Sequence, residues 1–127
     1  MEIKNLSKLI FTIFLFSVFL IFGCTNQEQP KFVEGDETLE VTLLDPNNNP
    51  ISNVEIDLWI SQEPNGPPTA GYLITNTEGK VIFQVPEGEY LIGFNQNNFP
   101  KEFIDPGKNS VSVKKGENQK TIILNLN

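Results

Sequence analysis

The chain has 127 residues, with 9 lysines and arginines against 16 acidic residues and a net charge of −7. Such an acidic balance argues against nucleic acid as a partner, because phosphates call for a basic protein surface. With no histidine and a single cysteine, the sequence offers neither a Ser-His or Cys-His nucleophile nor the usual zinc ligands. We therefore expect no catalytic residues, no metal site and no enzymatic activity.

The N-terminal segment combines positive charge with a short apolar run. Lys4 and Lys8 precede residues 9–22, which are apolar except for Thr12 and Ser17. As a helix this run would extend roughly 21 Å, less than the roughly 30 Å of a bilayer's hydrocarbon core. A basic start, an apolar middle of this length and a small residue at its end predict a secretory signal peptide.

The apolar run ends in Ile21-Phe22-Gly23-Cys24, which resembles the lipobox of bacterial lipoproteins. The resemblance implies that a signal peptidase recognises Ile21 and Gly23, removes residues 1–23 and leaves Cys24 at the new N-terminus. It also implies a diacylglyceryl group on the Cys24 sulfur, whose acyl chains insert into membrane lipid, and no other cofactor. Two acyl chains meet the requirement for stable membrane attachment.

The location implied is therefore extracytoplasmic, on the cell membrane or the outer membrane. The alternative is an uncleaved N-terminal anchor in which the cysteine is incidental. Residues 24–37 are polar and read as a flexible tether, with an r.m.s. reach of roughly 20 Å. The remaining residues, 38–127, are expected to form one domain.

Period-two alternation of apolar residues dominates this domain, most clearly in Val54-Glu55-Ile56-Asp57-Leu58-Trp59-Ile60. Alternation of this kind predicts half-buried strands, and turn-forming residues separate the segments. The fold class expected is all-β, an antiparallel Greek-key sandwich of about seven strands. The last two strands are expected to pair as a hairpin. The expected strands are 39–43, 54–60, 72–75, 80–85, 90–95, 110–114 and 120–126.

Several of these segments, in this order, resemble the carboxypeptidase regulatory-like and other transthyretin-like (prealbumin-like) domains. The resemblance is carried by residues 39–58, by Thr75 to Phe83 with its central Gly79, by Val85 to Tyr90 with Gly88, and by residues 111–124. It implies structural roles for four of these residues: Gly79, Phe83, Gly88 and Tyr90. Independently, the two glycines permit positive φ, and Tyr90 can bury its ring while its hydroxyl bonds nearby backbone.

The outward face of the 54–60 strand holds the candidate ligand-binding residues. Alternation places Trp59 there with Glu55 and Asp57, and Tyr72 is expected to share this side. An exposed Trp–Tyr pair flanked by carboxylates would suit a sugar ring. The competing prediction is that the proline-rich loop 61–71, or a second molecule, covers Trp59 and that the two acids only aid solubility.

The sequence thus favours a lipid-anchored, extracytoplasmic, non-catalytic β-sandwich serving as a surface structural, adhesion or assembly module. A small lipoprotein that binds carbohydrate or peptide through Trp59, Tyr72 and the 61–71 loop is the main alternative. An accessory to a membrane transporter or protease is a third. The candidate partners are membrane lipid through Cys24 and a surface protein or glycan.

Overall fold

The structure, a computed structural model, describes residues 33–127. The expected signal peptide, Ile21, Gly23 and the lipidation site Cys24 lie outside the described residues, as does most of the expected tether. The described residues belong to one compact unit. No helix within the described part is long and apolar enough to cross a membrane.

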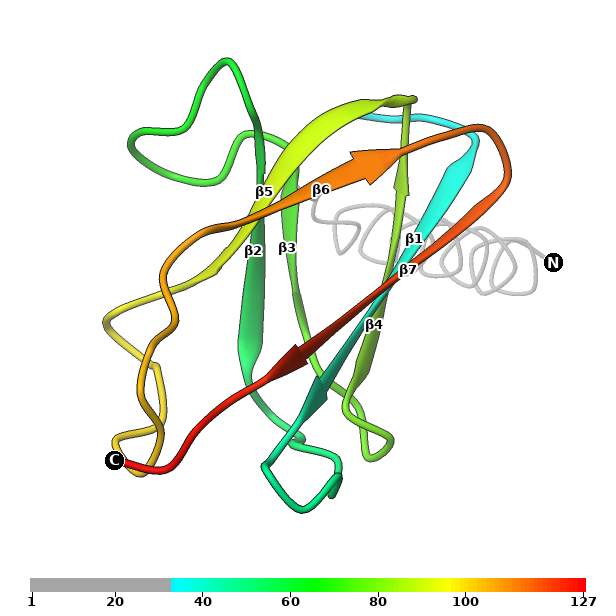
Figure 1. The fold of residues 1–127 in the computed structure, drawn as a ribbon. Coiled ribbons are helices and arrows are strands. Elements are labelled where there is room, and N and C mark those ends of the chain that lie inside the picture. The colour runs from blue at the N-terminus through cyan, green and yellow to red at the C-terminus, as the bar shows by residue number, and fades with distance from the viewer. Residues whose placement is uncertain (1–32) are drawn as a thin grey trace, which may run out of the picture. The chain divides into compact units, whose positions relative to one another are not determined.

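Seven strands form two sheets packed face to face (Figure 1). The three-stranded sheet has the order β4-β1-β7 and the four-stranded sheet the order β3-β2-β5-β6. The predicted all-β sandwich is therefore confirmed. The strands are β1 (Glu37–Leu44), β2 (Glu55–Ile60), β3 (Gly71–Ile74), β4 (Lys80–Val85), β5 (Gly88–Phe94), β6 (Asn109–Val113) and β7 (Glu117–Ile123).

One strand pair departs from the expected antiparallel pattern. β1 pairs with β4 antiparallel but with β7 parallel, from Thr38 opposite Glu117 to Leu44 opposite Ile123. Figure 1 shows these two strands running side by side in the same direction. Parallel neighbours need a long connection between them, and here that connection is the rest of the domain.

The predicted closing hairpin is wrong. β6 pairs with β5 in the four-stranded sheet, whereas β7 pairs with β1 in the other sheet. The short connection between β6 and β7 therefore crosses from one sheet to the other. The Asn118 side chain shapes this crossing: its Oδ1 accepts from the backbone N–H of Lys114 at 3.0 Å, and its Nδ2 donates to the Thr38 carbonyl at 3.1 Å. The β3–β4 connection likewise changes sheets and is not a hairpin.

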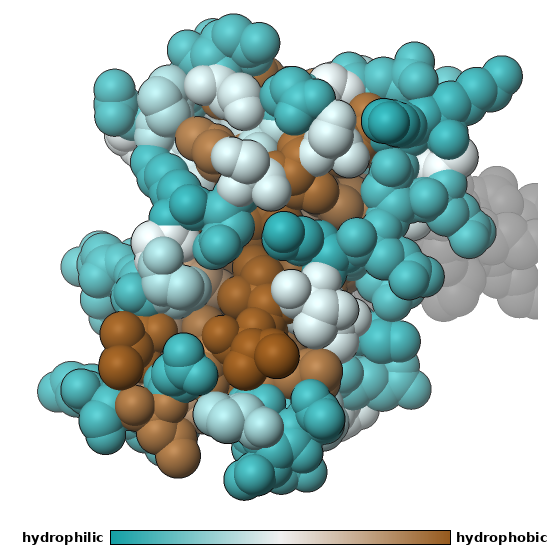
Figure 2. Space-filling model, viewed as in Figure 1, coloured by the Kyte–Doolittle hydropathy of each residue, from teal (hydrophilic) through white to brown (hydrophobic). Residues whose placement is uncertain are grey.

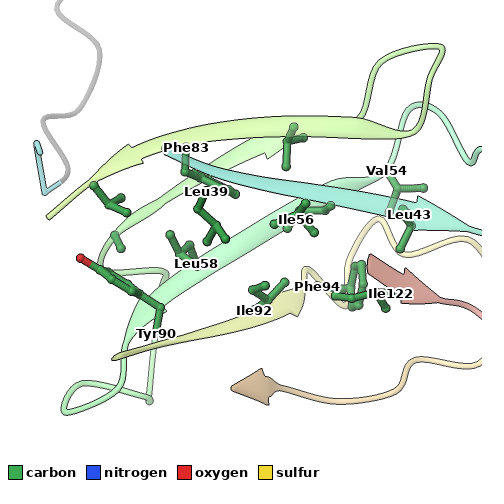
Figure 3. Packing of buried hydrophobic residues seen from close by; sticks show 14 of the residues in the cluster. Leu39, Leu43, Val54, Ile56, Leu58, Phe83, Tyr90, Ile92, Phe94 and Ile122 are labelled. Carbon is green, nitrogen blue, oxygen red and sulfur yellow. The ribbon is translucent and has the colours of Figure 1, made fainter. Parts of the chain in front are cut away.

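The core lies between the inward faces of the two sheets (Figure 3). Strand alternation sends every second side chain into this layer, as predicted for β2, β4 and β5. Burying this apolar surface is the main source of the fold's stability, since the described residues include no cysteine. The labelled side chains that meet there are Leu39, Leu43, Val54, Ile56, Leu58, Phe83, Tyr90, Ile92, Phe94 and Ile122.

The turn residues take the roles predicted for them. Gly79 and Gly88 have φ values of +73° and +157°. Tyr90 is buried, and its hydroxyl donates to the Pro86 carbonyl at 2.7 Å. Burial raises the pKa of the Tyr90 hydroxyl. This hydrogen bond fastens the β4–β5 crossing to the core.

Figure 2 shows a mainly hydrophilic surface on which apolar side chains gather toward the end where β7 finishes. The exposed apolar residues of that end include Ile104, Ile123 and Leu126. The chain there is held by a hydrogen bond from the Ile104 N–H to the Asn125 carbonyl at 2.9 Å and by a bridge between Phe103 and Leu126.

Candidate functional site

The four predicted ligand-binding residues lie on or beside the outer face of the four-stranded sheet. Glu55, Asp57 and Trp59 occupy alternate positions of β2. Asp57 lies opposite Tyr72 of β3 on one side and opposite Gly93 of β5 on the other. The sheet thus brings all four residues together, as the sequence predicted.

Trp59, however, is covered. Only 5% of its surface is exposed, and its indole Nε1 donates to the Gly66 carbonyl at 3.0 Å. The loop that folds over it is anchored further by the Thr69 hydroxyl, which accepts from the Ile60 N–H at 2.8 Å. An open Trp–Tyr platform for a sugar is therefore not present, and the prediction that the proline-rich loop covers Trp59 is confirmed.

A second segment, residues 95–108, completes the cover. The Lys108 Nζ lies 4.2 Å from the centroid of the Trp59 ring, a cation–π distance, and it also donates to the Pro64 carbonyl. Beneath the ring, Gly93 leaves the space that the indole fills. A Cβ there would approach Trp59 Cζ3 to 2.8 Å. Indole, lysine and loop therefore form one packed unit.

The two acids of β2 differ sharply in environment. Glu55 is half-buried and accepts a hydrogen bond from Asn98 Nδ2 at 3.4 Å. Asp57 is only 4% exposed, and its Oδ1 is buried without a hydrogen-bond partner among the described residues. The expectation that both acids face solvent is therefore wrong for Asp57, because the two loops bury the face on which it lies.

This environment changes the acidity of Asp57. Burial, followed by the hydrogen bond with Glu55 and its negative charge, raises the pKa of Asp57 to about 7. A buried carboxylate loses hydration, and a second carboxylate beside it disfavours its charged form further. The pair therefore holds a proton under conditions in which an exposed aspartate is ionised.

Tyr72 differs from Trp59, since 46% of its surface is exposed. It lies on β3, which forms an edge of the four-stranded sheet. Its neighbours Leu73 and Ile74 are also exposed. The outer face is thus closed over β2 but open along β3.

Sequence reasoning offered the 61–71 loop as a cover for Trp59 but missed the second covering segment. Asn98 contacts Glu55 across 43 positions of the chain, and Lys108 contacts Trp59 from the same segment. No local pattern in the sequence indicates contacts of that range. Gly93 carried a usable signal, because a glycine within an alternating strand marks a close approach by another group.

A separate concave surface lies on the three-stranded side of the domain's start, away from Trp59. An open hollow of about 400 Å³ beside the start of β1 is lined by Glu34, Gly35, Asp36 and Gln84. Among the described residues, no group of three or more His, Cys, Asp or Glu side chains is placed to hold a metal ion.

No protein-family model matches the sequence, and no curated protein matches it. Solved structures do share its fold. BcpA, the major pilin subunit of Bacillus cereus, superposes with a TM-score of 0.59 and 15% identity, over 72% of this chain and 29% of the pilin. GBS52, a minor pilin of Streptococcus agalactiae, gives a TM-score of 0.60 and 15% identity, over 77% of this chain and 48% of the pilin.

A third similar structure is an enzyme, the 5-hydroxyisourate hydrolase of Klebsiella pneumoniae. It superposes with a TM-score of 0.53 and 15% identity, over 72% of this chain and 91% of the hydrolase. The chain spans less than half the length of both pilins. At these identities the likeness establishes a shared fold, found in pilins and in an enzyme alike.

Proposed function

We propose that the protein is a lipid-anchored, extracytoplasmic and non-catalytic β-sandwich that acts as a structural or assembly module at the cell surface. Cys24 is its anchor, and the sandwich is the part that the anchor presents. The tether between them is shorter than the expected 24–37, since Gly35 packs against Pro86 and Glu37 begins β1. The fold shared with two bacterial pilins supports a surface module. The lipobox-like end of the apolar run supports the anchor.

The observation that carries the proposal is the parallel pairing of β1 and β7. Since the first and last strands run in the same direction, the domain begins at one end of the sandwich and finishes at the other. The eight residues of β1 extend about 26 Å at about 3.3 Å per residue. A domain anchored before β1 would hold the end of β7 at that distance from its point of attachment.

The end where the chain joins β1 is firmly packed. A Cβ added at Gly35 would lie 2.0 Å from the Pro86 nitrogen, so the backbone at residue 35 presses against the β4–β5 crossing. The Thr38 N–H donates to the Gly116 carbonyl at 3.1 Å. Pulling on the tether would therefore load the body of the domain directly, as suits a spacer.

The carbohydrate-binding alternative has less support, because it requires the Trp59 ring to be accessible and the ring is covered. A catalytic role has little support either, since the sequence contains no histidine and its one cysteine is assigned to lipid. We retain a surface protein as the partner class that this proposal implies.

The test is replacement of Cys24 by serine in the producing cell. The wild-type protein should fractionate with membranes, incorporate a palmitate analogue and have the mass of a chain beginning at a lipidated Cys24. The Cys24→Ser variant should lose the label and remain uncleaved. A Ser17→Ala variant serves as the control and should behave as wild type.

Equal labelling of the wild-type and Cys24→Ser proteins would overturn the lipid anchor. An unlabelled wild-type protein that stays uncleaved in the membrane would favour the simple N-terminal anchor.

A further inference from the structure

The outer face of β2 carries two neighbouring carboxyl groups that have no part in the proposed function. Asp57 is nearly fully buried, and its Oδ1 has no hydrogen-bond partner among the described residues. Glu55 is two positions earlier on the same strand and therefore faces the same side. Two neighbouring carboxyl groups cannot both ionise without strong repulsion.

In the part of the chain that the structure describes, no lysine forms an ion pair with Glu55 or Asp57. Lys108 lies at this face, but its Nζ is held over the Trp59 ring and by the Pro64 carbonyl. In the described part of the chain, Asp57 forms no ion pair, and the salt bridge observed joins Lys80 to Glu40. Across the sheet, Asp57 lies opposite Tyr72 on β3 and opposite Gly93 on β5, neither of which is a basic residue.

The covering segments themselves bring mixed charges that point elsewhere or into solvent. Glu63 in the 61–70 loop is exposed, as are Lys101 and Glu102 in the 95–108 segment. Asp105 accepts a hydrogen bond from Gln96 within that segment. The acid pair therefore depends on its own proton to avoid two negative charges side by side.

The same pair is tied to the cover of Trp59. Asn98 donates to Glu55 and so fastens the 95–108 segment to the pair. Lys108 at the other end of that segment joins the Trp59 ring to Pro64, and Trp59 itself holds Gly66. The acid pair and the two covering segments thus form one connected set of contacts.

We propose that Glu55 and Asp57 form a proton-operated clasp that closes residues 61–70 and 95–108 over Trp59. With one proton held between the two carboxyl groups, the cover is closed. When the proton passes to solvent, repulsion between two carboxylates and the hydration of Asp57 loosen the Asn98 contact and then the cover. The raised pKa of Asp57, about 7, would set this transition near neutral pH.

Trp59 is the single tryptophan of the chain, so its fluorescence reports directly on the cover. The experiment follows acrylamide quenching and the emission maximum of the full-length protein in mild detergent from pH 5 to pH 9. In the wild type, quenching should rise severalfold and the emission should shift to longer wavelength, with a midpoint near pH 7. The Asp57→Asn variant should show no transition and remain closed.

Two further variants sharpen the test. In Glu55→Gln the like charge is absent, so the midpoint should move to lower pH. Glu78→Gln removes an exposed acid of the β3–β4 turn and should leave the wild-type midpoint unchanged. Should Asp57→Asn fail to fold, carbon-13 NMR of the wild-type Asp57 carboxyl group provides an independent measurement.

Quenching that stays flat across this pH range in the wild type would overturn the clasp. A transition in Asp57→Asn that matches the wild type would also overturn it, as would an Asp57 carboxyl group that titrates below pH 5.

Discussion

Gly79 occupies a backbone conformation that other residues rarely adopt, and it does so where no side chain fits. Its φ is +73°, and an added Cβ would lie 2.5 Å from the Leu43 carbonyl oxygen. The Gly79 carbonyl accepts from the Leu43 N–H at 2.7 Å, so the β3–β4 crossing is held against the end of β1. If the turn moved away to make room for a Cβ at residue 79, this hydrogen bond would break.

We therefore expect Gly79→Ala to lower the free energy of unfolding by about 2–4 kcal/mol, the sum of left-handed strain and a steric clash with backbone. The matched control is Gly107→Ala, where φ is +78° but nothing lies within 4 Å of the added Cβ. Gly107→Ala should lower the free energy of unfolding by about 1–2 kcal/mol. Urea unfolding followed by circular dichroism measures both, and equal losses would refute the clash.

The stability of the domain should also depend on pH, through Asp57. The pKa of Asp57 is raised in the folded state, from 3.8 to about 7, so the folded protein binds the proton more tightly than the unfolded chain. Its contribution to stability is therefore complete below about pH 4 and is lost as the pH rises to about 7. For a single proton the slope is at most about 1.4 kcal/mol per pH unit.

Relative to wild type, Asp57→Asn should thus gain stability as the pH rises from 5 to 8, with no further relative gain at higher pH. Urea unfolding at several pH values measures this difference. A wild-type-minus-variant difference that is independent of pH between 5 and 8 would contradict the assignment.

At the scale of elements, β2 has two buried faces that are buried for different reasons. Its inward residues Ile56 and Leu58 pack between the sheets. Its outward residues are buried by the 61–70 loop and the 95–108 segment, through the contacts of Trp59 with Gly66 and Lys108. Loop contacts of this sort are the first to open in a folded protein, since they bury little and lie near solvent.

Trp59→Phe retains an aromatic ring but removes the indole N–H that holds the Gly66 carbonyl. The loss of one hydrogen bond is expected to cost about 1 kcal/mol, with the effect concentrated in the loop. Amide hydrogen exchange should therefore accelerate in residues 61–70, while the β1–β4 ladder remains protected. Val111→Ala, a substitution of similar cost away from the loop, is the control. If exchange accelerated uniformly over the domain in both variants, the idea that the Trp59 N–H holds the loop would be contradicted.

At the scale of the whole domain, the direction of β7 decides which surface is presented. Glu78 lies in the turn before β4, at the end where β1 finishes, because Lys80 pairs with Thr42. Lys115 lies at the other end, just before β7 and next to Glu87, which accepts from the Lys115 N–H. On a membrane-anchored protein these two positions should differ in accessibility.

Single cysteines at the two sites, Glu78→Cys and Lys115→Cys, test this in intact cells with Cys24 consumed by lipid. A small impermeant maleimide should label both. A maleimide on a large polyethylene glycol should label Glu78→Cys severalfold faster, since the membrane hinders its approach to the near end. Equal rates with the large reagent would refute this orientation, and no labelling of either variant would refute a position at the outer surface of the cell.

Much of the fold could be predicted from the sequence, because alternation and turn chemistry depend on residues that are near one another in the chain. Alternation placed Ile56, Leu58 and Phe83 in the core correctly, because a strand's side chains point to opposite faces whatever the strand pairs with. The Tyr90 hydroxyl and Gly79 were also predicted correctly, since a turn's requirements are set by a few neighbouring residues.

Strand partners were harder to predict. The spacing between β6 and β7 is that of a hairpin, yet each strand finds its partner elsewhere in the chain. The candidate site shows the same division: the sequence placed Trp59 and Asp57 on the outward face of β2 and offered the 61–71 loop as a cover, but it gave no sign of the 95–108 segment. Their burial depends on Gly66, Asn98 and Lys108, which are distant from them or lack a periodic pattern.

By itself, then, the sequence determined about where seven strands lie, although β7 is Glu117–Ile123 and not 120–126. It also determined which side chains of β2, β4 and β5 face the core and which chemistry the absence of histidine removes. Only the tertiary structure decided that β1 and β7 are parallel, that two loops close over Trp59, and that Asp57 is buried beside Glu55. The physical reason is range: alternation and turn geometry act between near neighbours in the chain. Sheet pairing, burial and the acidity of a carboxyl group depend on residues that only folding brings together.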